Sequence, residues 1–247
     1  MKQYVITPAA GKRLIAKALA RHPDVTATLQ SGTLVIVAGT TNAYVAQEVL
    51  GALGEADGFS PKGFRRGVVS PPGVKPGGGE FGGDVVIRDG KWLKGKQIFD
   101  VADDLGRDDL ILKGANALDT RGRPAVLIGH PQAGTAAAVI AAVAGRGTKL
   151  IVPVGLEKRI FEDVDVLAAE IDPGRHEGPA LLPLPGVAFT EFEAVEVLTG
   201  ACLRLLAAGG VHGAEGALWV GVEGDDRELA QADTLLRETG KEPPCEF

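Results

Sequence analysis

Cysteine, methionine and histidine are all scarce in this 247-residue chain, which has two, one and four of them, respectively. Two cysteines without a Cys-x-x-Cys pair cannot build the disulfide framework of a small secreted domain. The four histidines lack the spacing that is typical of a metal site. We therefore expect neither a metal nor another cofactor.

Long apolar runs and an excess of positive charge are also missing. Residues 1–6 lack the apolar stretch and the cleavage site of a signal peptide, and no later segment is apolar enough for a membrane helix. The net charge of −6 provides no broad basic surface for nucleic acid. These absences predict a cytoplasmic protein whose partners include neither membrane nor nucleic acid, and a homo-oligomer is compatible with the composition.

What the chain does contain is a series of short apolar runs separated by helical patterns. The β-branched run at 33–37 is typical of a strand buried on both faces of a parallel sheet. Further strands are expected at 110–112, 125–128 and 150–152, and an Ala-rich helix at 134–144. This alternation predicts an α/β fold.

Turn-forming residues divide the chain and suggest two units. They cluster at 172–179, where the apolar pattern lapses. We expect a Rossmann-like α/β domain at residues 1–175 and a small α+β domain at 176–247. The small domain should contain, in order, a strand at 181–189, a helix at 191–208, a strand at 217–222 and a helix at 226–239. A Gly/Pro-rich stretch at 58–79 predicts a long loop or a flexible lid.

Two glycine-containing loops follow predicted strands and resemble a known family. Residues 39–43 (GTTNA) resemble the G-T-G-S-T-A loop of ribose-5-phosphate isomerases, and residues 114–119 (GANALD) are similar to their G-A-D-E-V-D segment. The similarity continues through residues 149–152, 157–159 and 183–185. The chain thus resembles the ribose-5-phosphate isomerase and CoA-transferase-like superfamily. This resemblance implies a doubly wound, mostly parallel sheet with a small ferredoxin-like α+β domain.

The chain departs from these isomerases where they carry their acid and base groups. Asn116 replaces the first aspartate of the G-A-D segment, whereas Asp119 matches the second. Residues 127–134 stand where the isomerases have a lysine followed by glycines, and alanines at 136–138 replace a helix that carries a glutamate. Because an amide cannot act as a general base, the family's own reaction is not expected.

A binding geometry is still expected, because loops at the carboxyl ends of strands attract anions through backbone N–H groups and helix N-termini. Asn42 and Asn116 are the only asparagines and both lie in these loops, although asparagine also suits turns. Thr40 or Thr41 can equally cap a helix. The predicted ligand-binding residues are Gly39, Thr40, Thr41, Asn42, Gly114, Asn116, Arg65, Arg66 and Lys158.

Asp119 and His130 are the candidate catalytic residues, since a carboxylate or an imidazole can move a proton. Each can instead be an ordinary turn or loop residue. We expect a small anionic metabolite, phosphorylated or carboxylated, as the ligand, and isomerisation by proton transfer as the reaction of an enzyme of this kind. A CoA or acyl transferase relative and a non-catalytic ligand sensor are the alternatives.

Overall fold

The computed structural model describes residues 1–70, 72–73, 83–171 and 176–245. The predicted lid at 58–79 and the turn cluster at 172–179 therefore lie partly outside the described residues. Within the described part, the protein is a mixed α/β structure with several sheets.

The largest sheet in the described residues has six strands in the order β10-β8-β5-β2-β3-β4. Four of them are parallel, and β3 and β4 form an antiparallel hairpin at one edge. The strands predicted at 33–37, 110–112 and 150–152 are confirmed as β2, β5 and β8. The bounds are β2 (Thr33–Ile36), β3 (Val85–Arg88), β4 (Lys91–Trp92), β5 (Leu110–Leu112), β8 (Lys149–Pro153) and β10 (Val187–Phe189).

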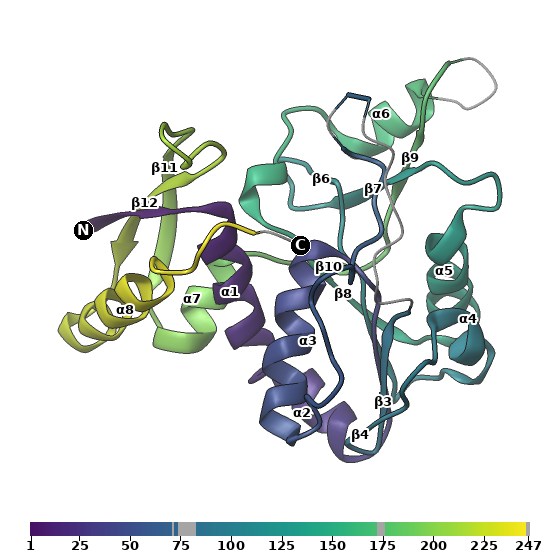
Figure 1. Ribbon diagram of the computed structural model, residues 1–247. Helices are drawn as coiled ribbons and strands as arrows, with labels where there is room; N and C mark the ends of the chain where they lie inside the picture. Colours follow the sequence, from purple (N-terminus) through teal and green to yellow (C-terminus); the bar gives the residue numbers. More distant parts are fainter. Residues whose placement is uncertain (71, 74–82, 172–175, 246–247) are drawn as a thin grey trace.

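Helices lie on both faces of this sheet (Figure 1). Helices α1 (Pro8–Leu19) and α3 (Thr40–Leu53) pack together on one side, and α4 (Ile98–Val101) and α5 (Gly134–Arg146) lie on the other. The helix predicted at 134–144 is thus confirmed as α5. The short helix α2 (Pro23–Gln30) and the turn η1 (Ala102–Asp104) complete this part of the chain.

A second, antiparallel sheet has the order β6-β7-β9 and stands beside the first. Its strands are β6 (Ala117–Leu118), β7 (Pro124–Ile128) and β9 (Ala180–Pro183), with the turn η2 (Leu156–Lys158) and α6 (Val164–Glu170) nearby. The strand predicted at 125–128 exists as β7, but it does not join the six-stranded sheet. Residues 119–123 form a tight turn that reverses the chain, so β7 pairs back onto β6.

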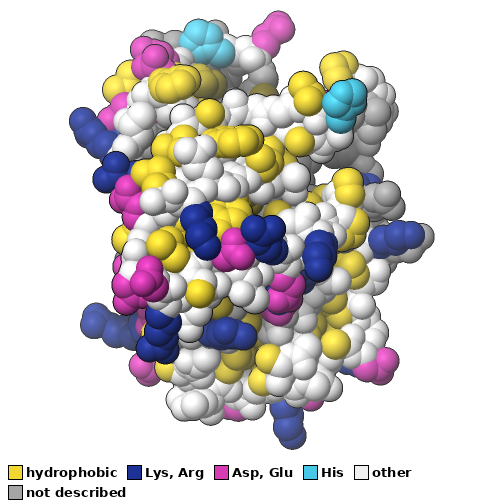
Figure 2. Space-filling model, turned by 90° about the vertical axis from the view of Figure 1, so that its left-hand side faces the viewer, with side chains coloured by type: hydrophobic (Ala, Val, Ile, Leu, Met, Phe, Trp, Pro, Cys, Tyr) yellow, Lys and Arg dark blue, Asp and Glu magenta, His cyan; other side chains and the backbone are white. Residues whose placement is uncertain are grey.

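The third sheet joins the two ends of the described chain, in the order β1-β12-β11. Strand β1 (Lys2–Ile6) runs antiparallel to β12 (Leu218–Glu223), which also pairs with β11 (Cys202–Ala208). Helices α7 (Glu191–Thr199) and α8 (Asp226–Thr239) belong to the same part of the molecule (Figure 1). Figure 2 shows the molecule from the left-hand side of Figure 1, and on this face positive and negative side chains are interspersed.

The predicted order of the C-terminal part is confirmed for 217–222 and 226–239 and needs two corrections. The helix predicted at 191–208 ends at Thr199, because Gly200 adopts a left-handed φ of 80°, and residues 202–208 are strand β11. The strand predicted at 181–189 is two strands, β9 and β10, which pair with β7 and β8 of the preceding part. Several strand pairs therefore link residues 1–175 to residues 176–245.

Most of the buried apolar side chains form one core between the six-stranded sheet and its helices, and this core extends to the sheet β1-β12-β11 and to α8. A smaller cluster around Ala125 and Val164 lies under the β6-β7-β9 sheet. In the described ranges, we find no helix with the length and hydropathy needed to cross a bilayer.

Candidate functional site

The four parallel strands place their carboxyl ends along a single edge of the six-stranded sheet. Because β2 and β5 are parallel neighbours, residues 39–42 after β2 lie beside residues 113–114 after β5. The first residues of the two predicted ligand loops, Gly39 and Gly114, thus follow neighbouring strands. We call residues 39–42, 113–114 and Thr135 the β2–β5 edge. In the sheet, β3 lies on one side of β2 and β5 lies on the other, so the strand order changes direction at β2. Open α/β sheets commonly bind ligands at such a topological switch point.

Asn42 ties these two strands together. Its Nδ2 donates to the carbonyl oxygens of Val37, at 2.7 Å, and Leu112, at 3.0 Å, and the residue is buried. Its Oδ1 atom is also buried but accepts no hydrogen bond within the described structure. The amide donor is thus committed to the fold, and the oxygen is the atom that a ligand or water could still use.

The N-terminus of α3 is not capped by a side chain. Gly39 takes the N-cap position in an extended conformation, and Thr40 and Thr41 form the first turn. Thr41 is buried, and its hydroxyl lacks a hydrogen-bond partner in the described part of the chain. The first-turn N–H groups of a helix with no side-chain cap are available to an acceptor such as a phosphate or carboxylate oxygen.

Lys113, which the sequence analysis missed, supplies positive charge at the same edge. It directly follows β5, is 7% exposed, and donates from Nζ to the Thr135 hydroxyl at 3.2 Å. Burial lowers the pKa of Lys113 to about 8, with a raising effect from Asp84 and a lowering effect from Arg66. Thr135 lies in the first turn of α5, whose N-terminus also lacks a side-chain cap. The position of Lys113 immediately before Gly114 is the sequence signal that could have identified this lysine.

Arg66 is held by a buried carboxylate beside this edge. Its Nη1 lies 2.9 Å from Oδ1 of Asp84, and its Nη2 donates to Gln97 at 2.8 Å. Asp84 also accepts hydrogen bonds from the backbone N–H groups of Ala38 and Ile98. Arg65, the other predicted anion-binding arginine of this loop, is exposed. Arg66 therefore contributes to a fixed ion pair near Lys113.

Lys158 lies further along the same edge, in a charge cluster formed by the buried Lys12 and Glu191 and the half-buried Glu157 and Lys158. Lys12 Nζ lies 3.1 Å from Oε1 of Glu157, and Lys158 Nζ donates to the carbonyl of Ala115 at 2.9 Å. Burial lowers the pKa of Lys158, partly offset by Glu157. This cluster joins α1, η2 and α7 to the loop after β5.

Glu191 is the second titratable group that sequence reasoning missed. It begins α7, is 1% exposed, and accepts the Leu156 N–H at 2.9 Å. Burial and the neighbouring Glu157 raise the pKa of Glu191 to about 7. Its carboxylate packs against the α-carbon of Gly11, where an added Cβ would lie only 2.3 Å from Oε1. The preceding Thr190 caps the helix, and that cap is the visible sequence signal for this position.

Asn116 and Asp119 have structural contacts in the loop that leads into β7. Asn116 Oδ1 accepts the Leu127 N–H at 3.0 Å. Asp119 accepts hydrogen bonds from the backbone N–H groups of Arg121 and Arg123 and forms an ion pair with the Arg123 guanidinium at 2.7 Å. Although burial raises the pKa of Asp119, the hydrogen bonds from Arg123 and Arg121 bring it below its ordinary value. Both of its oxygens are therefore occupied within the fold.

His130 is exposed at the end of β7, in the loop that precedes α5. Its Nδ1 accepts the Gln132 N–H at 3.1 Å, which closes a short turn. Its place in this loop brings it near the N-terminus of α5, while its observed hydrogen bond is local.

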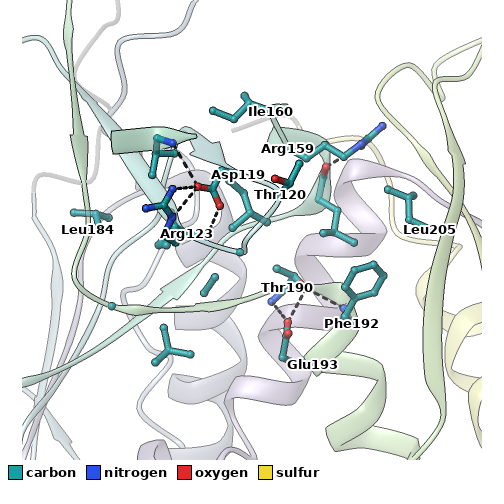
Figure 3. A pocket seen from close by; sticks show the side chains of 18 of the residues that line it. Asp119, Thr120, Arg123, Arg159, Ile160, Leu184, Thr190, Phe192, Glu193 and Leu205 are labelled. Atoms are coloured by element: carbon teal, nitrogen blue, oxygen red, sulfur yellow. Dashed lines mark hydrogen bonds and ion pairs between the residues drawn. The ribbon is translucent and has the colours of Figure 1, made fainter. Parts of the chain in front are cut away.

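A cavity of about 1080 Å³ lies between the β6-β7-β9 sheet and β11, and we call it the apolar cavity. Its walls include the apolar side chains of Ile160, Leu184, Phe192 and Leu205. Figure 3 shows Asp119 turned toward Arg123, and Glu193 turned toward Thr190.

The structure thus separates the predicted site residues from one another. Gly39 to Asn42 and Gly114 lie at the β2–β5 edge, with Arg66 beside them, whereas Asp119 lines the apolar cavity. Among the described residues, no group of three His, Cys, Asp or Glu side chains is arranged to hold a metal ion. Comparisons of the chain with protein-family models, with curated proteins and with solved structures found no match.

Proposed function

We propose that this chain binds a small phosphorylated or carboxylated metabolite at the β2–β5 edge. The observation that carries the proposal is Lys113, a buried ammonium group whose hydrogen-bond partner is the hydroxyl of Thr135. No carboxylate lies within ion-pair distance of its Nζ in the described structure. Because a buried charge is costly without a partner, an anionic ligand is the group that best completes this site.

The surrounding backbone supports the same ligand class. The N-termini of α3 and α5 both meet the β2–β5 edge, and neither is capped by a side chain. The partial positive charge of a helix N-terminus favours anions, and its free N–H groups can bind oxygen atoms. The hydroxyl of Thr41 and the Oδ1 of Asn42 add two buried polar atoms that have no partner in the described residues.

Proton transfer on a sugar phosphate is the reaction that we propose for this site. With a pKa of about 8, Lys113 exists near neutral pH as an ammonium with a fraction of neutral amine. The neutral amine can take a proton from one carbon of the sugar phosphate, and the resulting ammonium can return it to the adjacent carbon. We assign this role to Lys113 ahead of Asp119, because the oxygens of Asp119 already accept several hydrogen bonds. His130, in the loop before α5, is the second candidate for the proton-transfer role.

The finer fold assignment belongs to the same proposal. Four parallel strands with helices on both faces support a doubly wound sheet of the ribose-5-phosphate isomerase and CoA-transferase-like type. The antiparallel sheet β1-β12-β11 with α7 and α8 supports a relationship to a small ferredoxin-like unit.

Calorimetric titration with inorganic phosphate and with ribose 5-phosphate tests the proposal. We expect Lys113→Met to weaken binding at least about tenfold, the usual effect of losing a hydrogen bond to a charged group. Lys149→Met is the matched control, because Lys149 begins β8 at the opposite edge of the sheet and pairs with Asp24. Equal affinity in the wild type and in Lys113→Met would contradict the proposal.

Turnover is tested separately by following isomerisation of the same sugar phosphate by NMR. If binding depends on Lys113 but no turnover is observed, the protein binds the ligand without catalysing its isomerisation, and the isomerase assignment is wrong.

A further inference from the structure

The apolar cavity is separate from the β2–β5 edge and is lined by different segments. It is bounded by the turn after β6, the segment after η2, the link from β9 to β10, the start of α7 and β11. A volume of about 1080 Å³ is comparable to the upper range of small-molecule sites. Apolar walls of this size favour a ligand with a substantial hydrocarbon part.

Most of the charged groups that line this cavity are already paired. Arg123 forms ion pairs with Asp119, Asp163 and Asp165, and Arg204 lies 3.2 Å from Glu223. Glu193 accepts hydrogen bonds from both the backbone N–H and the hydroxyl of Thr190. These groups therefore have little capacity to recognise a further charge.

Arg159 differs from these residues. Its Nη1 donates to the carbonyl of Leu156 at 2.8 Å, and no carboxylate pairs with its guanidinium in the described part of the protein. The residue follows η2, is partly buried, and lines the cavity together with the apolar Leu156 and Ile160. Figure 3 shows Arg159 and Ile160 on the same side of the cavity. A guanidinium at an apolar wall can bind a carboxylate through its remaining N–H donors.

We propose that the apolar cavity binds an amphipathic carboxylate, with its hydrocarbon part against the apolar walls and its carboxylate on Arg159. The site is independent of the ligand proposed for the β2–β5 edge. A carboxylate is preferred over a neutral apolar ligand, because Arg159 is the one arginine of the described lining that pairs with no carboxylate, whereas the carboxylate of Glu193 already accepts two hydrogen bonds from Thr190.

Titration calorimetry with octanoate and with 1-octanol tests the proposal, because the two probes share a hydrocarbon chain and differ in charge. We expect the wild type to bind octanoate more tightly than octanol. Arg159→Gln should weaken octanoate binding about tenfold and leave octanol binding unchanged. Arg204→Gln is the matched control, since that arginine lines the same cavity and is paired with Glu223. It should bind both probes like the wild type.

Two filling variants locate the bound probe. Leu205→Trp should block both octanoate and octanol, and Val187→Trp should do the same from an exposed position that is less prone to disturb folding. Lys113→Met should leave octanoate binding unchanged, and Arg159→Gln should leave phosphate binding unchanged, which separates this proposal from the previous one.

Several results would overturn the inference. Equal affinity of the wild type for octanoate and octanol would show that the cavity recognises no carboxylate. Unchanged binding in the folded Val187→Trp variant would place the probe elsewhere. Absence of octanoate binding, together with self-association that Val187→Trp disrupts, would assign the cavity to a protein interface instead.

Discussion

At the scale of single residues, Lys113 combines a role in ligand recognition with a cost in stability. Its pKa falls from 10.5 in an unfolded chain to about 8 in the folded protein. At pH 7 the ammonium group of Lys113 is therefore charged and buried in the folded protein, which costs desolvation free energy. In the unfolded chain the same group is charged in water and has no such cost. A shift of this size corresponds to about 3 kcal/mol at most. Residues kept at such a cost are typical of functional sites.

We expect Lys113→Met to raise the free energy of unfolding at pH 7 by about 1–3 kcal/mol, since the methionine removes the buried charge but also the contact with Thr135. The contribution of Lys113 to wild-type stability should increase as the pH rises from about 8 toward 10.5, because the unfolded chain then binds more protons. Urea unfolding at pH 7 and pH 9.5 measures both effects. A less stable variant at pH 7 would contradict this account.

Glu191 has the opposite pH dependence. Its pKa is raised from 4.5 to about 7, so the folded protein retains a proton that the unfolded chain loses. The stability that this group provides is complete below pH 4.5 and is lost as the pH rises through about 7. We expect Glu191→Gln to match the wild type at pH 4.5 and to be more stable at pH 8 by about 1–3 kcal/mol.

The side-chain amide of the Glu191→Gln variant can still accept the Leu156 N–H, so the comparison isolates the charge. Thermal unfolding between pH 4.5 and pH 8 measures the difference, with Glu196→Gln on the exposed side of α7 as the control. Parallel stability curves for the wild type and Glu191→Gln would show that Glu191 does not titrate in this range.

The two asparagines show what could and could not be inferred about the site from residue type. The sequence correctly indicated that Asn42 lies at the carboxyl edge of the parallel sheet, because a continuous apolar run followed by a glycine is typical of a buried strand that ends in a loop. It could not indicate that the amide donor binds Val37 and Leu112, since those contacts depend on which strand lies beside β2. Lys113 was missed for a related reason: burial of its ammonium group is a property of the assembled edge.

At the scale of elements, the transition from α7 to β11 is controlled by Gly200. The sequence analysis continued the helix to residue 208, because Leu203, Leu205 and Leu206 are also compatible with a helical apolar face. Gly200 ends the helix with φ at 80°, and pairing with β12 then decides the strand. Strands β2, β5 and β8 were predictable because burial on both faces requires continuous apolar runs.

We expect Gly200→Ala to lower the free energy of unfolding by about 1–2 kcal/mol, because alanine is strained at this left-handed position. An added Cβ would also lie 3.0 Å from Oε1 of Glu228. Chemical denaturation measures the loss. Gly145→Ala within α5 is the control, since no atom lies within 4 Å of its added Cβ and it should be neutral or stabilising. Equal effects of the two substitutions would contradict the role given to Gly200.

At the scale of the whole molecule, β1 connects the beginning of the chain to its last strand. Lys2 lies opposite Val222, and Ile6 opposite Leu218, in the sheet β1-β12-β11. We expect removal of residues 1–6 to raise amide exchange rates in β11 and β12 while β2 and β5 remain protected, because β12 loses the hydrogen bonds on one side. Hydrogen exchange with mass spectrometry measures both regions, and unchanged protection of β12 would refute the prediction.

The pairing of β1 with β12 also constrains the order of events during synthesis on the ribosome. Strand β1 is made before the other described strands, but its partner β12 is made only after the strands of the six-stranded sheet. The parallel sheet can thus begin to form before β1, which precedes α1 in the chain, has its partner strand β12. Closure of the small sheet depends on contacts between distant parts of the chain, which are slow to form. We infer that pairing of β1 with β12 is a late event, and that a nascent chain stalled before β12 exposes β1 as a free edge.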